Sequence, residues 1–354
     1  MSYIADDRVV HSLDMHTVAK AEFLVAFEEL ILLPRQLDYK VQFPGPAGAN
    51  AVEAALKLAR KATGRTQVVA FAGAFHGVTL GALAVTDSEL HRRVSGVPLQ
   101  HAVRAPFACP LGPNDAASAS IDSVLQETDL SFEQVAAVIV ETVQGEGGIN
   151  VAPLDWLSQL AALCQRQGVL LIVDDVQMGC GRTGPFFSFE VAGITPDIVC
   201  LSKSISGYGL PLALTLVRPD LDIWEPGEHN GTFRGINPAF VTGTAALRAY
   251  WQDKALEEAT LDKGQRVAAA LADLAESVPG TSVQPRGRGL ARGLAFEDGE
   301  LARKVAAAAF ERGLLVETAG RDGEVVKLLP PLTASDSELD QGIALLAQAL
   351  RTVC

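Results

Sequence analysis

The sequence lacks any hydrophobic run long enough to cross a membrane. Its longest apolar stretches, such as residues 169–173, are far shorter than the roughly 20 residues that a membrane-spanning helix needs. Residues 1–7 contain no basic segment followed by an apolar one, so no signal peptide is recognisable there. Internal repeats and low-complexity tracts are absent as well. These absences favour a globular protein with no membrane partner.

Cysteine and basic residues are also scarce. The cysteines are odd in number, scattered and without metal-ligand spacing: Cys109, Cys164, Cys180, Cys200 and Cys354. We therefore expect no metal site and a reducing cytoplasm as the location. Lysine and arginine number 29 against 42 aspartates and glutamates, a formal net charge of −13. That balance excludes a general nucleic-acid binder, because such proteins need a basic face.

What the chain does contain is typical of the α/β class. A length of 354 residues, 48% hydrophobic content and 32 glycines suit a tightly packed protein with many strand-to-helix turns. From about residue 40, helical segments alternate with short apolar runs at 68–71, 136–143, 168–176, 197–202 and 212–217. These runs are apolar on both faces, which predicts a mostly parallel sheet covered by helices on both sides.

The two ends of the chain have a different texture. An amphipathic helix is predicted near the start, over 17–32, with a buried side made of Val18, Ala21, Val25, Leu30 and Ile31. A long helix over 244–274 is predicted to lead out of the large sheet into a smaller α+β region. We expect an N-terminal helical segment at 1–39, a large domain at 40–245 and a small C-terminal domain at 246–354.

Two charged residues stand at the carboxyl ends of predicted strands, where open α/β sheets bind their ligands. The strand at 168–173 is followed by Asp174, and the strand at 197–201 leads to Lys203. Either residue alone is typical of a helix cap or a solvated surface charge. Together they supply what pyridoxal 5′-phosphate (PLP) requires: an amine for an imine bond and a carboxylate that keeps the pyridine nitrogen protonated.

A glycine-rich turn offers a place for the phosphate of that cofactor. Residues 44–50 read PGPAGAN and precede a strongly helical segment, whose first N–H groups would face an anion. Asn50 either caps this helix or donates to the phosphate. Phe75 follows the strand at 68–71 and offers an aromatic face for a ring to stack on, although taken alone it is more typical of a core residue.

Six ordered motifs resemble those of the class III (ω-amino acid) aminotransferases. They span nearly the whole chain and read PGPAGANAVEAALKLAR, FAGAFHG, VIVETVQGEGG, LLIVDDVQMGCGRTG, PDIVCLSKSISGYGLP and GTFRGINPAF. Four segments look most like the diaminobutyrate–2-oxoglutarate aminotransferases of ectoine biosynthesis: LDMHTVAKAEF, LDYKVQFPGP, SISGYGLP and PGEHNGTFRG. The resemblance implies the PLP-dependent transferase fold type I, with a mostly parallel central sheet covered by helices and a smaller α+β C-terminal domain.

The resemblance also implies roles for individual residues. Lys203 and Asp174 are the expected catalytic residues: Lys203 holds PLP as a Schiff base and shuttles a proton, and Asp174 pairs with the pyridinium nitrogen. The other expected cofactor contacts are Gly48, Ala49 and Asn50 on the phosphate, Phe75 stacked on the ring with His76 alongside, Gln177 near the phenolic oxygen, and Thr232. The family usually has serine or threonine where Ala49 stands, so one hydroxyl contact is missing. Thr232 is expected to reach the phosphate of the neighbouring subunit, which requires a homodimer.

On the substrate side, related enzymes use a switchable pair of a glutamate and an arginine. Glu146 matches the glutamate, and Lys327 stands where the basic partner is expected. Lysine is a point charge without the planar fork of arginine, so its grip on a carboxylate is less directional. A plain surface lysine near a strand end remains the alternative. Glu141 is expected to orient polar groups in the active site.

The implied reaction moves the amino group of L-glutamate to L-aspartate 4-semialdehyde, giving L-2,4-diaminobutyrate and 2-oxoglutarate. Two alternatives stay open: another ω-aminotransferase acting on ornithine, acetylornithine or 4-aminobutyrate, and a truncated, non-catalytic protein of the same fold. The match to the family begins almost at Met1, whereas family members carry a further N-terminal segment that helps to line the substrate pocket. We therefore expect PLP binding to be kept better than turnover.

Overall fold

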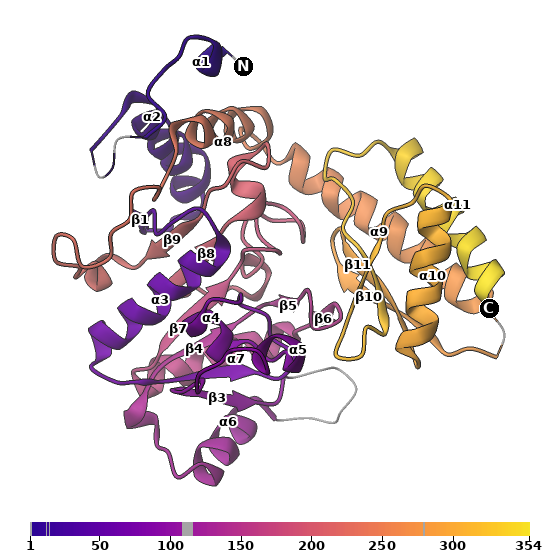
Figure 1. The fold of residues 1–354 in the computed structure, drawn as a ribbon, viewed down its shortest axis with the longest axis horizontal. Coiled ribbons are helices and arrows are strands. Elements are labelled where there is room, and N and C mark those ends of the chain that lie inside the picture. The colour runs from indigo at the N-terminus through magenta and orange to yellow at the C-terminus, as the bar shows by residue number, and fades with distance from the viewer. Residues whose placement is uncertain (1, 12, 14, 108–115, 279) are drawn as a thin grey trace.

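The computed structural model describes residues 2–11, 13, 15–107, 116–278 and 280–354, so Cys109 lies outside the described residues. A seven-stranded sheet and a four-stranded sheet organise these residues (Figure 1). In spatial order the larger sheet contains β1 (Lys40–Gln42), β9 (Leu214–Val217), β8 (Ile198–Leu201), β7 (Leu170–Asp174), β4 (Val135–Val140), β2 (Gln67–Phe71) and β3 (Ala102–Ala105). The five strands from β8 to β3 are mutually parallel, whereas β9 is antiparallel to β8 and β1 to β9. The predicted mostly parallel sheet is confirmed.

Both faces of this sheet are covered by helices. Alternate strand residues such as Val68, Ile139 and Ile172 pack under α3 (Gly48–Thr63) and α4 (Leu80–Val85). The residues between them, such as Val138 and Leu171, face α6 (Ala116–Glu127) and α7 (Leu154–Gln167). A short helix, α5 (Glu89–Arg92), lies between β2 and β3 along the chain. Burial on both faces explains why these strands are apolar at nearly every position.

The N-terminal region contains α1 (Ser2–Ala5) and α2 (Val18–Phe27), which continues in helical turns to Arg35. Figure 1 shows α2 beside α8 (Asn237–Tyr250). The predicted helix forms, but its predicted buried side is wrong at three of five positions. Phe23 and Phe27 are fully buried, whereas Val18 and Val25 are 76% and 49% exposed and Ala21 is exposed. Apolar residues occur on every side of this helix, so the hydrophobic pattern alone does not show which side is buried. The large rings of Phe23 and Phe27 decide it.

The predicted continuous helix over 244–274 is also wrong, because the chain breaks between α8 and α9 (Ala255–Glu276). Trp251 leaves helical geometry at φ −124° and packs edge-on against Phe186, with ring centroids 4.9 Å apart. Asp253 Oδ1 then accepts a hydrogen bond of 2.9 Å from the N–H of Ala255, which starts α9. A buried aromatic ring and a hydrogen bond to the Asp253 side chain thus interrupt the segment that the sequence pattern predicts as one helix.

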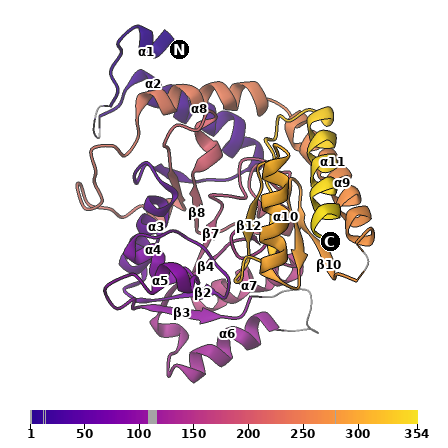
Figure 2. The same ribbon diagram turned by 45° about the vertical axis from the view of Figure 1, so that its right-hand side comes forward.

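The C-terminal sheet contains β10 (Val283–Arg288), β11 (Ala291–Phe296), β13 (Val325–Leu328) and β12 (Glu317–Ala319), all antiparallel. One face packs on α9, α10 (Gly299–Glu311) and α11 (Asp336–Val353). From its other face Ala291, Ala295 and Val325 pack against Val143 and Ile149 of the large region, near the short strands β5 (Val143–Gln144) and β6 (Asn150–Val151). Figure 2 shows this sheet and its helices side by side with the larger sheet.

Among the described residues, no helix combines the length and hydrophobicity needed to cross a membrane. The same residues contain no group of three or more histidine, cysteine, aspartate or glutamate side chains arranged to hold a metal ion.

Candidate cofactor and substrate site

A cavity of about 170 Å³ opens at the carboxyl ends of β7 and β8. These strands pair in parallel, so Asp174 at the end of β7 lies beside Cys200, three residues before Lys203. The predicted site residues that line the cavity are Gly48, Ala49, Phe75, His76, Glu141, Glu146, Asp174, Gln177 and Lys203. The described lining residues do not include Asn50, Thr232 or Lys327. The rule that ligands lie beyond the carboxyl ends of the strands therefore locates the cavity from the sequence.

Lys203 sits at the start of a 3₁₀ turn, η5 (Lys203–Ser206), in an unusual backbone conformation. Its φ of 50° lies in the left-handed region, which non-glycine residues rarely adopt and which is often found at functional positions. The side chain is exposed on the cavity wall, yet the surrounding protein displaces water. This desolvation lowers the pKa of the Lys203 ammonium below its usual value, although the charges of Glu146 and Asp174 oppose the shift.

Asp174 is buried and held from two sides. Its Oδ2 lies 2.7 Å from Nδ1 of His76, and its Oδ1 accepts a hydrogen bond of 3.1 Å from the N–H of Val176. Burial disfavours the imidazolium, but the hydrogen bond and negative charge of Asp174 raise the pKa of His76 above its ordinary value. His76 Nε2 is buried without a hydrogen-bond partner among the described residues. His76 thus fixes the orientation of the carboxylate that is expected to meet the cofactor nitrogen.

The start of α3 forms one wall of the cavity. A Cβ atom on Gly48 would stand 2.8 Å from Val176 Cγ1, so only glycine lets the helix approach this closely. Asn50 does not point its oxygen into the cavity: Oδ1 accepts a hydrogen bond of 3.1 Å from the N–H of Ala47 and caps the helix. The structure shows the capping role of Asn50, and a phosphate contact from its side-chain NH2 group stays a prediction. The first N–H groups of α3 remain the natural ligands for a phosphate.

Glu141 links the two loops that form the rim of the cavity. Its Oε1 accepts a hydrogen bond from the N–H of Phe75 at 2.9 Å, and its Oε2 accepts one from the N–H of Gly145 at 3.1 Å. Burial raises the pKa of this carboxyl to about 7, with the charge of His76 acting in the opposite direction. Glu141 therefore positions both Phe75, which is predicted to stack on the cofactor ring, and the loop that carries Glu146.

Glu146, in the turn between β5 and β6, forms an ion pair with Lys327 on β13 of the C-terminal sheet. Lys327 Nζ lies 2.6 Å from Glu146 Oε1, which also accepts a hydrogen bond of 3.1 Å from Gln177 Nε2. Burial would raise the pKa of Glu146, but these donors hold it below its usual value. Lys327 is 3% exposed, so the alternative of a plain surface lysine is wrong. Its ammonium also contacts Glu317 Oε2 at 3.3 Å, a contact that the sequence does not suggest.

A buried acid and a half-buried arginine near it, Asp175 and Arg288, escaped prediction. Asp175 is 1% exposed, accepts a hydrogen bond of 2.8 Å from the N–H of Ser188, and has an Oδ1 without a partner among the described residues. Arg288, on β10 of the C-terminal sheet, donates to Thr142 Oγ1 and to Ser188 O at 2.9 and 2.7 Å. Burial raises the pKa of Asp175 to about 7, and the nearby charge of Arg288 counters this shift. The sequence could have indicated Asp175, because this acid directly follows Asp174 at the end of a predicted strand. Nothing in the sequence indicates that Arg288 lies near it.

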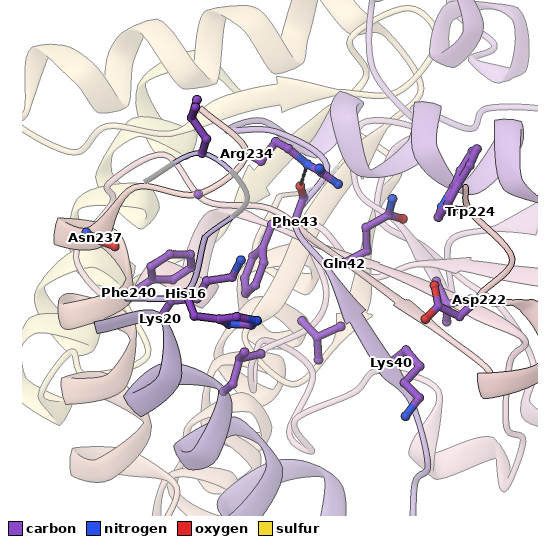
Figure 3. Close-up of a pocket in the computed structure, with 15 residues that line it drawn as sticks. His16, Lys20, Lys40, Gln42, Phe43, Asp222, Trp224, Arg234, Asn237 and Phe240 are labelled. Carbon is purple, nitrogen blue, oxygen red and sulfur yellow. Dashed lines mark hydrogen bonds between the residues drawn. The ribbon is translucent and has the colours of Figure 1, made fainter. Parts of the chain in front are cut away.

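A separate cavity of about 330 Å³ lies beside α2, β1 and α8, and none of the residues predicted for the site is among its described lining residues. Figure 3 shows His16, Lys20 and Phe240 on one side of it and Trp224 and Asp222 on the other. Arg234 donates from Nε to the carbonyl of Phe43 at 3.0 Å. This residue belongs to the GTFRG segment, in which Thr232 is exposed. The predicted phosphate contact of Thr232 is thus not made to the cavity of its own chain.

The donor groups of the smaller cavity fit PLP. Four kinds of group surround this one cavity: the amine of Lys203, the carboxylate of Asp174, the aromatic ring of Phe75 and the start of α3 at Gly48. Each matches one part of the cofactor: the aldehyde carbon, the ring nitrogen, the ring face and the phosphate.

Comparison with known proteins identifies the family. The family model described as "Aminotransferase class-III" matches residues 8–350 of this chain. A diaminobutyrate–2-oxoglutarate transaminase of Nocardia farcinica is 62% identical over 354 residues, 100% of this chain and 81% of that protein. One of Streptomyces avermitilis is 56% identical over 352 residues, 99% of this chain and 83% of that protein.

Solved structures agree with this match. The lysine aminotransferase of M. tuberculosis superposes with a TM-score of 0.83 at 27% identity, over 96% of this chain and 81% of that chain. The ornithine aminotransferase of Toxoplasma gondii, whose active site holds partially occupied PLP, gives a TM-score of 0.84 at 25% identity, over 99% of this chain and 80% of that chain. The chain therefore belongs to the class III family of PLP-dependent aminotransferases.

Proposed function

We propose that the chain transfers the amino group of L-glutamate to L-aspartate 4-semialdehyde, giving L-2,4-diaminobutyrate and 2-oxoglutarate. One observation carries this proposal: a buried cation, Lys327, is paired with Glu146 at the rim of the cavity that contains Lys203. Two relatives that are 62% and 48% identical to this chain are named diaminobutyrate–2-oxoglutarate transaminases, which supports the choice of substrates.

The residues at the inner end of the cavity act on the amino group. PLP, when bound, supplies the electron sink that allows the C–H bond beside that group to break. Because desolvation lowers its pKa, the Lys203 amine is more readily neutral and can take up this proton at Nζ and return it. Asp174, oriented by His76, would keep the ring nitrogen of the cofactor protonated. Phe75, positioned by Glu141, would cover the ring face and exclude water.

The residues at the rim accommodate two different substrates. Glutamate presents its α-amino group, so a carboxylate lies beside the reacting carbon and needs a cation, whereas diaminobutyrate presents a terminal amine with no carboxylate beside it. Lys327 would supply that cation when it leaves Glu146, and Glu146 would neutralise Lys327 when no such carboxylate is present. A pair that opens and closes in this way lets one site serve both half-reactions.

We infer that the active form is a cytoplasmic homodimer. Thr232 is exposed at a distance from the cavity of its own chain, as expected of a residue that serves the phosphate of a partner subunit. Cys164, Cys180 and Cys200 are buried free thiols, which suits a reducing compartment. Analytical ultracentrifugation tests the assembly: a dimer is expected, and a monomer with full activity contradicts this part of the proposal.

A panel of half-reactions tests the substrates. We expect glutamate and 2,4-diaminobutyrate to change the absorbance of the bound cofactor, whereas ornithine and 4-aminobutyrate do so at least about tenfold less efficiently. Conversion by ornithine alone would make the chain a different ω-aminotransferase. Absence of any spectral change with all four amines would indicate a non-catalytic protein.

A further inference from the structure

A second cation of the C-terminal sheet contacts the turn that carries Glu146. This Glu146 turn comprises residues 145–150, from the end of β5 to the first residue of β6. Arg286, on β10, donates from Nη1 to Asn150 Oδ1 at 3.0 Å, and Figure 1 shows β6 beside β10. Lys327, on β13, contacts Glu146 Oε1 at 2.6 Å. Two basic side chains from different strands therefore bind opposite ends of the same turn.

Asn150 connects Arg286 to the rest of the turn. While its Oδ1 accepts from Arg286, its Nδ2 donates to the carbonyl of Gly147 at 2.8 Å and to Gln144 Oε1 at 3.1 Å. Gln144 donates from Nε2 to the carbonyl of Ala72, in the loop that follows β2, at 2.8 Å. A charged donor binds an amide oxygen more strongly than a neutral donor does. Arg286 thus orients an amide that holds both arms of the turn.

Arg286 and Lys327 lie in one row across the C-terminal sheet. Arg286 is the direct cross-strand partner of Gly293 on β11, and Gly293 is the partner of Lys327, so all three share the face that packs against β5 and β6. Because glycine has no side chain, the row has a gap between its two cations. A Cβ atom on Gly293 would stand 3.3 Å from Cγ1 of Ile149, so Ile149 reaches this gap.

The backbone of Ile149 adopts an unfavourable conformation. Its φ of 55° lies in the left-handed region, where a β-branched residue is rarely found. Such a conformation persists only when the surrounding contacts hold it. The Ile149 side chain is fully buried, and the contacts of Arg286 and Lys327 lie on either side of it. The turn would therefore relax if these contacts were lost.

The proposed function breaks one of these contacts in one half-reaction. When glutamate binds, Lys327 would leave Glu146 for the substrate carboxylate. Among the described residues of the C-terminal sheet region, polar contacts to the turn would then come from Arg286 and from the N–H of Gly320, which donates to the Glu146 carbonyl at 2.9 Å. Arg286 is the charged donor of the two. When diaminobutyrate presents its terminal amine, the pair stays closed and the turn keeps both cations.

We propose that Arg286 is a positioning residue that keeps the Glu146 turn in place while Lys327 serves the carboxylate of glutamate. This assignment rests on the proposed function, because only a pair that opens makes the second cation necessary. Arg286 is not among the described lining residues of the cavity that contains Lys203, whereas Glu146 is. Arg286 therefore acts through the turn and needs no contact with a ligand.

The test compares two half-reactions and one structural measurement in three variants of the holoenzyme. Arg286→Met removes every donor of the side chain, and Arg286→Lys keeps its charge without the planar fork. Arg303→Met is the matched control, because this exposed arginine of α10 donates to the carbonyl of Asp322 at 3.0 Å, away from the turn. Single-turnover kinetics are measured with glutamate and with 2,4-diaminobutyrate. Hydrogen–deuterium exchange of residues 144–150 is followed by mass spectrometry without substrate.

We expect Arg286→Met to lower the efficiency of the glutamate half-reaction by about tenfold, the effect of losing one charged hydrogen bond. The diaminobutyrate half-reaction should fall by less than about threefold, because the closed Glu146–Lys327 pair still holds the turn. Exchange of the turn amides should become about tenfold faster or more. Arg286→Lys should show smaller changes in the same direction, and Arg303→Met should behave like the wild-type protein.

Two results overturn the assignment alone: equal losses in both half-reactions, as a general structural role would cause, or unchanged exchange of the turn in Arg286→Met. Thermal unfolding checks that each variant folds. If Arg286→Met does not fold, Arg286→Lys must show the selective loss with glutamate, and equal losses in that variant overturn the assignment. A wild-type protein that reacts with neither glutamate nor diaminobutyrate overturns the proposed function, and the exchange measurement still shows whether Arg286 holds the turn.

Discussion

The inner end of the cavity and its rim hold their charged groups in different ways. At the inner end, Asp174 and His76 are buried, 2.7 Å apart and supplied by the large sheet and its loops. At the rim, Glu146 comes from the large region and Lys327 and Glu317 from the C-terminal sheet, with both acids partly exposed. From this comparison we propose that the groups that would serve the cofactor are fixed within one region of the molecule, whereas the groups that would serve two substrates lie where two regions meet and can separate.

The largest expected effect distinguishes the two ends directly. Lys203→Ala should lower kcat by at least about a thousandfold, because it removes the group that moves the proton. Lys327→Gln should instead raise KM for glutamate by about tenfold with a smaller change in kcat. Steady-state kinetics measure both, with thermal unfolding as a check that each variant folds. Equal losses of kcat in the two variants would contradict the division between the two ends.

The next prediction concerns Arg288, which joins the C-terminal sheet to Thr142 and Ser188 near the buried Asp175. Arg288→Met should lower the free energy of unfolding by about 2–3 kcal/mol, because Thr142 and the Ser188 carbonyl lose their charged donor and Asp175 loses a nearby positive charge. The double variant with Asp175→Asn should be more stable than Arg288→Met alone, since no uncompensated charge remains. Urea unfolding of the three proteins measures this coupling. Strict additivity would show that the two residues do not interact.

The part of the site whose position could be predicted from the sequence is the part that we propose for the cofactor. Asp174 and Lys203 each follow an apolar strand, and parallel strands bring their carboxyl ends to one edge, so local pattern and a general rule were sufficient. Glu317 and Arg288 acquire their surroundings only when antiparallel strands of the C-terminal sheet dock on a distant loop. No local pattern encodes such docking. The prediction of the buried side of α2 was wrong for the same reason, because the tertiary packing of Phe23 and Phe27 decides which side is buried.

The pH dependence of folding stability tests the role of Glu141, the buried acid that links the two rim loops. Burial raises the pKa of Glu141 from 4.5 to about 7, so the folded protein binds this proton more tightly than the unfolded chain. Its contribution is favourable at low pH and is lost as the pH rises through 7. Relative to Glu141→Gln, the wild-type protein should lose roughly 2 kcal/mol of stability between pH 5 and pH 8. Urea unfolding across this range measures the difference. Parallel stability curves would mean that the Glu141 carboxyl is ionised in the folded protein throughout.

The smallest effect concerns the wall that faces the phosphate. Gly48→Ala places a Cβ atom 2.8 Å from Val176 and should cost about 1–2 kcal/mol, with weaker retention of PLP during dialysis. Gly342→Ala in α11 is the matched control, because its Cβ atom meets nothing closer than 3.7 Å and alanine favours a helix. The control should keep its PLP and gain up to about 1 kcal/mol. Loss of PLP from both variants would show that the effect is not local to α3.

The most direct measurement of the central claim is chemical. The purified protein is saturated with PLP, reduced with borohydride, digested and mapped by mass spectrometry. Lys203 lies at the ends of β7 and β8 beside Asp174, and the account predicts that the cofactor is found on the peptide that contains Lys203 and on no other lysine. Attachment at a different lysine, or no attachment in a folded protein that still transfers amino groups, would contradict it.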